Sequence, residues 1–447
     1  MNKYQSYKSS GVEWIGEIPK SWDSGKMKYV LSNNDGGVWG TDVEDGEEGT
    51  LVVRSTEITI DGKWDLSQIL KRKLTVIEVS KCKLFEGDIV ITKSSGSPQH
   101  IGKSVIVTKD IENLNCCYSN FVQRIRFKNY HSKLYHYILN SEIVREQFKF
   151  LTTSSTGLGN LNGTSLNDIL LPFIPYQEQL QIVHFLDEKT ELIDELISMK
   201  KRKINLLKEQ RISLINETVT KGLNSNVKMK GSGEEIIGEI PMSWNMYRVS
   251  NFGRFFKGSG IKKDEVKTEG IPCIRYGEIY TKYERVVYNP LSFIDIETSN
   301  NSIQIQKGDI LFTGSGETIE DIGKSLLYFG DRNIFVGGDI IVLRPKEGIS
   351  PLYLSYLMNT SFIKHQKSLM GRGEIIVHIY SKNIKEIKTP LPSIEEQLQI
   401  VEFLDSKTKE IDDLVQLEQK KIDLLKEYRQ SLISEVVTGK IKVITDE

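Results

Sequence analysis

The residues of this chain best suited to chemistry are lysine, serine, arginine and asparagine side chains in glycine-containing loops. One such loop, GSPQHIGKS at residues 96–104, invites comparison with a phosphate-binding loop. A Walker A loop has four residues between its first glycine and the GK pair, because its backbone amides must wrap one phosphate. Five residues intervene here, and six separate Gly316 from Gly323 in a similar loop. The spacing therefore predicts that neither loop binds ATP.

Sequence patterns typical of catalysis are missing as well. The chain has no H-x-x-x-H pair, no G-x-S-x-G elbow and no dinucleotide fingerprint. It also lacks the [DNS]-P-P-[YF] and P-D-x-x-K patterns, so we expect neither methyl transfer nor phosphodiester cleavage by the chain itself. The six histidines, His378 among them, are scattered. The four cysteines are spaced neither as a zinc site nor as a disulfide framework, which predicts buried or free thiols.

Two lysine–serine pairs occupy matched loop positions. Lys103 with Ser104, and Lys324 with Ser325, each precede a β-like run. A lysine and a hydroxyl at such a position can hold phosphates while carrying no sequence information.

Two arginines and two glycine-rich loops are further candidates. Arg54 and Arg275 could contact phosphate or guanine, and an ion pair with the glutamate three residues later is an equal alternative. The loops at residues 154–165 and 370–374 carry asparagine or arginine and permit close backbone approach. Simple turns are the alternative for both loops.

All these loops belong to two tandem copies of one unit. Residues 178–220 return at residues 396–438 without a gap, at an offset of 218 positions. EWIGEIPKSW and EIIGEIPMSW open the two copies, and GDIVITKS is matched by GDILFTGS. Repetition on this scale predicts two globular domains, each followed by a long helix.

The repeated stretch has the pattern of a helix that needs a partner. Its apolar residues recur in heptads, and neither copy contains proline or glycine between its ends. Each copy can therefore form one helix of roughly 65 Å. The domain that connects the two helices, with a radius of gyration of about 15 Å, is too small to bridge that length. We therefore predict that the helices run antiparallel, with one globular domain at each end.

Two charged residues interrupt the heptads at equivalent positions. In an antiparallel pair Lys200 and Glu418 would fall in the same or neighbouring layers, where opposite charges could specify the register. The alternative is that each side chain points along the surface into water.

The globular parts are predicted to mix helices and strands. Short β-rich runs bounded by turn residues occur at residues 87–92, 104–108, 308–313 and 339–343. Apolar residues at helical spacing predict helices at residues 134–150 and 352–369.

The predicted fold is therefore α+β, with two mixed α/β domains in a pseudo-twofold tandem repeat, separated by an antiparallel coiled coil of two long helices. The predicted bounds are 1–170 for the first domain, 171–222 for its helix, 223–388 for the second domain and 389–447 for the second helix, with a linker at 221–233.

Composition adds mainly exclusions. The 447 residues carry a formal net charge of −1, so any nucleic-acid surface must be a local patch or be completed by a partner protein. No run of about 18 apolar residues occurs, and the N-terminus lacks an apolar signal core. We expect a cytoplasmic protein.

The assembled pattern resembles the specificity subunit of Type I restriction-modification enzymes. The resemblance covers essentially the whole chain and is carried by YKSSGVEWIGEIPKSW, GDIVITKSSG and LPFIPYQEQLQIVHFLDEKTELID, the last repeated as LPSIEEQLQIVEFLDSKTKEID. A proline followed by EQxxIVxFLDxKTxxID and a long helix, present twice, is a specific combination.

The resemblance implies a non-catalytic DNA-binding subunit. Each globular part would be a target-recognition domain for one half of a split, asymmetric DNA sequence. The helix pair would set the spacing and dock two methyltransferase (modification) subunits, which recruit ATP-dependent restriction subunits. S-adenosylmethionine, ATP and Mg²⁺ would belong to those partners, with no cofactor bound by this chain.

The two globular sequences share a framework and differ elsewhere, for instance CCYSNFVQ against FVGGDIIV, so the two half-sites should differ. The predicted DNA contacts are Arg54, Lys93, Ser94, Lys103, Ser104, Asn160, Asn162, Arg275, Ser315, Lys324, Ser325 and Arg372.

One rival hypothesis is a coiled-coil scaffold whose globular ends bind protein, and another is an enzyme with an unrecognised site. An orphan subunit without a restriction partner is a variant of the main hypothesis.

Overall fold

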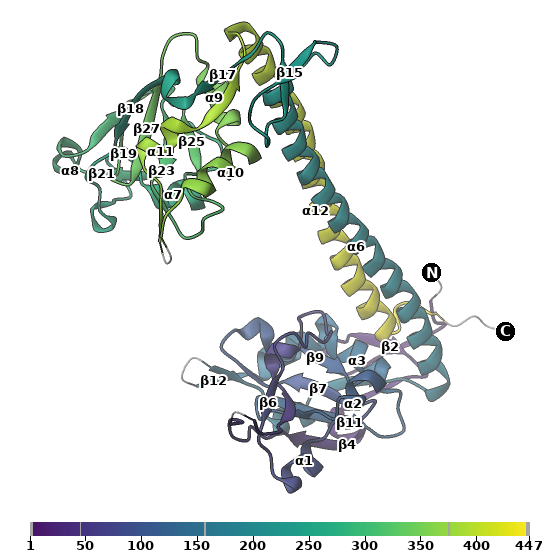
Figure 1. The fold of residues 1–447 in the computed structure, drawn as a ribbon. Helices are drawn as coiled ribbons and strands as arrows, with labels where there is room; N and C mark the ends of the chain where they lie inside the picture. The colour runs from purple at the N-terminus through teal and green to yellow at the C-terminus, as the bar shows by residue number, and fades with distance from the viewer. Residues whose placement is uncertain (1–2, 45, 156–157, 374–375, 444–447) are drawn as a thin grey trace. The chain divides into compact units, whose positions relative to one another are not determined.

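The computed structural model describes residues 3–44, 46–155, 158–373 and 376–443 and divides into two units (Figure 1). Unit 1 consists of Met1–Lys200 with Lys420–Glu447, and unit 2 consists of Lys201–Gln419. The two long helices, α6 (Tyr176–Lys221) and α12 (Ile394–Val437), are each shared between the units. Each unit therefore combines one globular part with a portion of each long helix, and the predicted mixed fold is confirmed.

The globular part of unit 1 is built on an antiparallel sheet in the order β4-β11-β7-β9. Its central strand β7 is buried along its whole length, as its unbroken apolar run predicts. A second sheet, β10-β5-β6, and short helices pack against it. The main elements are β4 (Leu31–Gly36), β5 (Thr50–Val53), β6 (Leu70–Arg72), α1 (Val76–Cys82), β7 (Ile89–Thr92), β9 (Ser104–Ile106), α2 (Lys109–Asn113), β10 (Cys117–Tyr118), β11 (Val122–Phe127), α3 (Ser132–Asn140), α4 (Glu142–Leu151) and α5 (Gly163–Asn167).

Unit 2 repeats this plan with larger sheets. Its main sheet has the order β18-β27-β23-β25-β20, and a second has the order β21-β19-β26-β22. The elements are β18 (Gly253–Lys257), β19 (Ile271–Ile274), α7 (Tyr276–Thr281), β20 (Val286–Val287), β21 (Ser292–Ile294), α8 (Ile296–Asn300), β22 (Ile303–Ile305), β23 (Ile310–Thr313), β25 (Ser325–Tyr328), β26 (Ile334–Val336), β27 (Ile340–Pro345), α9 (Pro351–Leu357), α10 (Ser361–Met370) and α11 (Ser381–Glu386).

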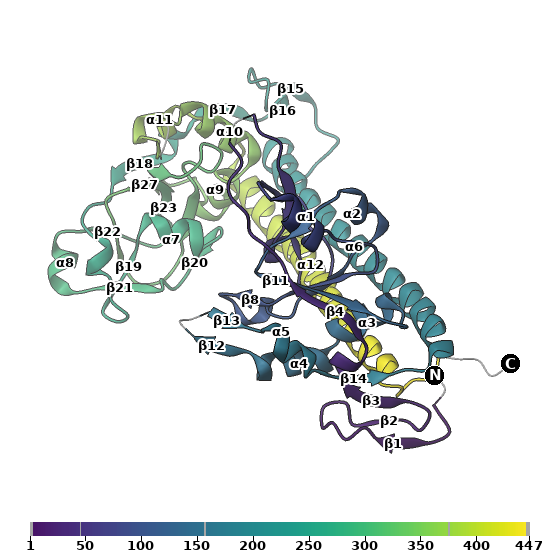
Figure 2. The ribbon, with the colours of Figure 1, turned by 90° about the horizontal axis from the view of Figure 1, so that it is seen from below.

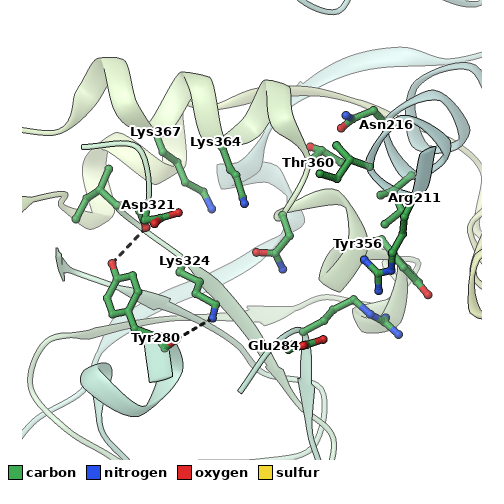
Figure 3. A pocket seen from close by; sticks show the side chains of 15 residues that line it. Arg211, Asn216, Tyr280, Glu284, Asp321, Lys324, Tyr356, Thr360, Lys364 and Lys367 are labelled. Atoms are coloured by element: carbon green, nitrogen blue, oxygen red, sulfur yellow. Dashed lines mark hydrogen bonds between the residues drawn. The ribbon is translucent and has the colours of Figure 1, made fainter. Parts of the chain in front are cut away.

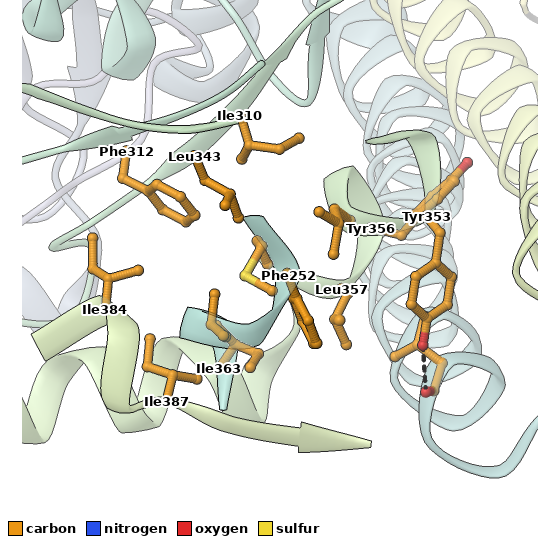
Figure 4. Close-up of a cluster of buried hydrophobic side chains, with 14 of the residues drawn as sticks. Phe252, Ile310, Phe312, Leu343, Tyr353, Tyr356, Leu357, Ile363, Ile384 and Ile387 are labelled. Carbon is orange, nitrogen blue, oxygen red and sulfur yellow. Dashed lines mark hydrogen bonds between the residues drawn. The ribbon is translucent and has the colours of Figure 1, made fainter. Parts of the chain in front are cut away.

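The hydrophobic core of unit 2 continues from its sheet into the helices. Phe252, Phe312, Leu343 and Leu357 pack together beneath the sheet (Figure 4). The same buried cluster contains Val219 of α6 and three residues of α12, which are Ile400, Val401 and Leu404. The long helices are therefore part of the domain core.

Polar residues of the repeated helix motif fasten each globular part to its helix. In unit 1 the indole N–H of Trp22 donates to Glu178 at 2.8 Å, and the hydroxyl of Tyr137 donates to Asp187 at 2.7 Å. The equivalent bonds in unit 2 are Trp244 to Glu396 at 3.2 Å and Tyr356 to Asp405 at 2.6 Å. These motif residues serve the fold and are not available for chemistry.

Ion pairs within each unit fix the direction of the helices. In unit 2, Arg211 pairs with Asp412 at 2.9 Å and Lys203 pairs with Glu418 at 3.0 Å, so residue numbers on α12 fall as those on α6 rise. Unit 1 has the counterpart of the first pair, Asp194 with Arg429 at 3.2 Å. The predicted antiparallel arrangement is confirmed.

Short paired strands tie the ends of the long helices to the opening segment of each unit. Figures 1 and 2 show the opening strands of unit 1 beside the C-terminal end of α12. There the hydroxyl of Tyr7 donates to the carbonyl of Gly439 at 3.1 Å. Gly439 has φ +72°, and a side chain on it would collide with Pro19, so glycine is required. The strand pairs are β1 (Tyr7–Ser9) with β2 (Glu17–Pro19), β3 (Asp23–Lys26) with β14 (Leu170–Phe173), β15 (Met229–Gly231) with β16 (Glu239–Pro241), and β17 (Asn245–Arg248) with β29 (Lys388–Leu391).

Two details differ from the sequence-based expectations. Each predicted helix at 134–150 and 352–369 is two helices, because the backbone turns to an extended conformation at Ser141 and Thr360. The hydroxyl of each of these residues donates to a carbonyl three residues earlier, at Ile138 and Leu357. The predicted linker at 221–233 contains β15, because Met229 pairs with Pro241. The predicted domain bounds stay a prediction, and near two of them β14 pairs with β3 and β29 pairs with β17.

Glu418 provides a test of how the register is set. Its side chain is almost fully buried beside the ammonium of Lys203, and its pairing with Lys200 stays a prediction. We expect Glu418→Lys to cost about 3 kcal/mol of unfolding free energy, because it buries a second positive charge beside Lys203. Adding Lys203→Glu should restore most of the loss, as measured by denaturant unfolding of the full chain. If Lys200→Glu restored it instead, Lys200 would be the register partner.

Candidate nucleic-acid interface

The two lysine–serine pairs predicted as phosphate contacts lie inside the globular parts. Lys103 is 4% exposed, and its ammonium donates to the carbonyls of Ser55 (3.0 Å) and Ile58. Lys324 donates to the carbonyls of Tyr283 (2.9 Å) and Tyr280 (3.4 Å). Burial is the main cause that lowers the pKa of both lysines. Both ammonium groups therefore hold neighbouring backbone in place.

The serines that follow these lysines are fully buried. Ser104 is the first residue of β9 and Ser325 is the first residue of β25. Neither hydroxyl has a hydrogen-bond partner within the described residues. Their placement favours a role inside the sheet over contact with an external phosphate.

The arginines form the ion pairs that the sequence left as the alternative. Arg54 donates to the buried carboxylate of Glu57 at 2.7 Å and to the carbonyl of Gln68 at 2.7 Å. Arg275 lies 3.7 Å from the carboxylate of Glu278, which is likewise buried. Each glutamate also accepts the backbone N–H of its arginine, so the pair stabilises the first helical turn.

The remaining predicted contacts of unit 1 gather at one edge. Strand β8 (Ser94–Ser95) pairs with β13 (Leu158–Asn160), which also pairs with β12 (Thr153–Ser155). Ser94 lies directly opposite Asn160, and its hydroxyl donates to Oδ1 of Asn160 at 2.9 Å. The carbonyl of Lys93 accepts from the N–H of Leu161 at 2.7 Å, and Asn162 caps α5. We call Lys93, Ser94, Asn160, Asn162 and the half-exposed Phe121 the β8–β13 edge.

Unit 2 has a corresponding edge. Strand β24 (Ser315–Gly316) pairs with β28 (Val377–His378), and Ser315 lies directly opposite His378. The hydroxyl of Ser315 and Nδ1 of His378 are 3.0 Å apart. The exposed Arg372 exchanges two backbone hydrogen bonds with His378, at 2.7 and 3.0 Å. We call Ser315, Arg372 and His378 the β24–β28 edge. Parts of the two predicted glycine-rich loops, at residues 156–157 and 374, lie outside the described residues.

His378 is the residue that sequence reasoning missed. It was grouped with scattered histidines, although it follows Asn160 by 218 positions, the offset of the helix repeat. That offset was the signal that could have found it. The same serine thus faces an asparagine in unit 1 and a histidine in unit 2.

The two edges have the same strand arrangement, but the side chains around them differ. The β8–β13 edge includes Lys93, and on the neighbouring strand β11 the amide of Gln123 donates to Asn34 at 2.7 Å. The positions that correspond by strand pairing in unit 2 are Gly314 and Ile341. The two edges therefore present different side chains on corresponding strands.

Other classes of site find little support in the described part of the chain. No cluster of three or more histidine, cysteine, aspartate or glutamate side chains there is arranged to hold a metal ion. Among the described helices, none combines the length and apolar character needed to cross a bilayer.

The contrast between Lys103 and Lys93 can be measured. We expect Lys103→Met to lower the unfolding free energy by about 1–3 kcal/mol, because two buried carbonyls lose their donor. Lys93→Met serves as the matched control and should change stability by less than about 0.5 kcal/mol, because the Lys93 side chain is only partly buried. Denaturant unfolding of the full chain compares the two, and equal losses would contradict the structural role of Lys103.

Comparisons with known proteins agree with this architecture. A family model described as the Type I restriction modification DNA specificity domain matches residues 19–209 and again residues 241–431, which together are more than half of the chain. A Methanocaldococcus jannaschii relative, named for the type I restriction enzyme MjaX specificity subunit, is 26% identical over 444 residues and 96% of each chain. The MjaVIII specificity subunit of the same organism is 24% identical over 318 residues, 69% of this chain and 70% of the relative.

Solved structures share the fold. A chain from a structure titled for complex assembly and conformational transition of the type I R-M system has a TM-score of 0.73 at 15% identity, covering 95% of this chain and 99% of that one. The HsdS subunit from Thermoanaerobacter tengcongensis has a TM-score of 0.54 at 16% identity, covering 95% and 98%. With its two matched domains, its paired long helices and its full-length relatives, the chain belongs to the family of type I restriction modification DNA specificity domains.

Proposed function

We propose that this chain is the non-catalytic specificity subunit of a Type I restriction-modification complex and that each unit reads one half of a split DNA target. The observation that carries the proposal is the matched cross-strand pair, Ser94 with Asn160 in unit 1 and Ser315 with His378 in unit 2. Two domains that recognise different half-sites need the same backbone arrangement with different side chains on it. The shared serine position, facing asparagine in one unit and histidine in the other, meets that need.

The chemistry of the edges fits base recognition. Asparagine suits the paired acceptor and donor of adenine in the major groove, and arginine suits the two acceptors of guanine. Asn160 on the β8–β13 edge and Arg372 on the β24–β28 edge are exposed and supply these groups. Of the twelve predicted contacts we retain Lys93, Ser94, Asn160, Asn162 and Arg372, which are at least partly exposed, and Ser315, which is buried but lies directly opposite His378 on the β24–β28 edge. The other six are buried or bound by partners within the fold.

The long helices support docking of two copies of one partner. In unit 1 the exposed apolar side chains on these helices include Leu180, Leu196, Met199 and Leu424. In unit 2 the residues equivalent by the repeat are also exposed, and these are Leu398, Leu414, Leu417 and Leu206. Two matching apolar surfaces favour two identical subunits, which we propose to be the methyltransferases.

A partner also suits the charge of the chain. With a net charge of −1, the chain alone offers little attraction for phosphates. We therefore propose that the methyltransferase subunits complete the DNA-binding surface and supply S-adenosylmethionine, while restriction subunits supply ATP hydrolysis and cleavage.

Mapping of methylated adenines tests the reading function. The chain is expressed with its methyltransferase, and methylation of one split motif across host DNA is expected. Asn160→Ala should relax or abolish reading of one half-site and His378→Ala the other, with discrimination falling by about 10–100-fold at the affected base. The proposal would be contradicted if both variants changed the same half-site. Methylation without any sequence motif would contradict it as well. Loss of all methylation with partners still bound would favour the protein scaffold.

Partner stoichiometry tests the docking surfaces. We expect Leu196→Glu and Leu414→Glu each to reduce the bound methyltransferase from two copies to one, because each places a charge in one apolar surface. The double variant should bind none, as read by native mass spectrometry. Leu369→Glu, at an exposed leucine of α10, is the matched control and should still bind two copies. Two copies on all three helix variants would contradict the assignment.

A further inference from the structure

Unit 2 contains a basic cavity that the proposed function leaves unused. Its volume is about 370 Å³, and it lies among α6, α7, α9 and α10 (Figure 3). Five basic side chains line it, against the two carboxylates of Glu284 and Asp321. The basic residues are Arg211, Arg285, Lys324, Lys364 and Lys367.

Neither arginine of the cavity is available to a ligand. Arg211 and Arg285 are each paired with an aspartate on α12, at 2.9 Å in both cases. Lys364 and Lys367 extend side by side from α10 into the cavity, and Lys324 enters from the opposite wall (Figure 3). Within the described residues Lys364 has no ion-pair partner. The ammonium groups of Lys364 and Lys367 thus lie side by side in the cavity, while that of Lys324 is turned toward the carbonyl of Tyr280.

Lys367 is placed where the fold does not require a lysine. It is 1% exposed, and its ammonium donates to the carbonyls of Gly323 (2.7 Å) and Met358 (2.8 Å). The equivalent residue in unit 1 is Phe148, which packs against the equivalent glycine, Gly102. Because burying an ammonium is costly and an apolar side chain serves in unit 1, the charge itself needs an explanation.

The electrostatics of the cavity point the same way. Burial, followed by the charge of Lys364, lowers the pKa of Lys367 to about 7. Glu284 and Asp321 act instead on Lys324, where they raise a pKa that burial lowers. An anion between Lys364 and Lys367 would therefore relieve a repulsion that no carboxylate of the cavity offsets.

We propose that this cavity binds a phosphate group, held by Lys364 and Lys367. Its size falls in the range of small-ligand sites, and a phosphate offers oxygen acceptors for Lys364 and for the N–H of Lys367 that its two carbonyl partners leave over. The group could belong to the DNA backbone at unit 2 or to a free phosphorylated molecule. Unit 1 has a phenylalanine in place of the buried lysine, so the site is specific to unit 2.

Thermal unfolding of the full chain tests whether the cavity binds a free phosphate. Inorganic phosphate should raise the Tm above that in chloride of equal ionic strength, because a ligand that binds only the folded state stabilises it. We expect Lys364→Gln and Lys367→Met to lose this increment. Lys346→Gln, at an exposed lysine of unit 2 outside the cavity, should keep it. Lys364 is exposed, so its variant carries the test if Lys367→Met does not fold.

DNA binding by the chain with its methyltransferase tests the other source. If a backbone phosphate occupies the cavity, Lys364→Gln should reduce the slope of log K against log salt by about 0.9, and Lys346→Gln should not. Either result, in one arm or the other, supports the site. No effect of phosphate and no change of slope overturns it. Because neither arm reads the methylated motif, loss of this site would leave the half-site assignment standing.

Discussion

Each long helix carries an apolar stripe too narrow to be buried by a helix standing alone, and the rest of the structure follows from how that stripe is covered. Within each unit, a portion of α6 lies antiparallel to a portion of α12, and an arginine–aspartate pair marks the register. The globular part then packs on this pair and shares its core, as Val219 and Leu404 do in unit 2. The paired helices and the globular part are therefore packed as one body in each unit.

The same constraint explains why the repeated motif is so recognisable in the sequence. Its tryptophan, glutamate, aspartate and tyrosine partners form a polar seam between helix and globular part, made twice with the same atoms. These residues are tied to geometry and not to any target. The edges that we propose to read DNA lie outside this seam and are free to differ, as Asn160 and His378 do.

Much of the fold could be predicted from the sequence because its signals are long. Two gapless 43-residue copies predicted the paired helices, and short β-rich runs located β7 and β23. Short signals failed. In each domain one hydroxyl, of Ser141 or Thr360, donates to a carbonyl three residues earlier where the helix is divided in two. The apolar spacing continues across that break, so it could not reveal the division. Strand β15 is only three residues long, too short to stand out from a linker.

The candidate site was less predictable, because residue type does not reveal what a side chain meets. Lys93 and Lys103 are ten positions apart in one loop region, yet only Lys103 is enclosed by backbone carbonyls. Both arginines were correctly seen to have a glutamate partner within reach, but the sequence alone left the choice open. His378 required the repeat offset to be applied to a region where the two copies otherwise diverge.

The division of the chain has a consequence for the order of folding during synthesis. Residues 201–419 contain everything that unit 2 comprises, so it can close as soon as they have left the ribosome. Unit 1 begins first but needs residues 420–443, including Gly439 against Pro19 and Tyr7. Unit 1 thus emerges before unit 2 but is completed after it, and until then the part of α6 that belongs to unit 1 lacks its partner on α12.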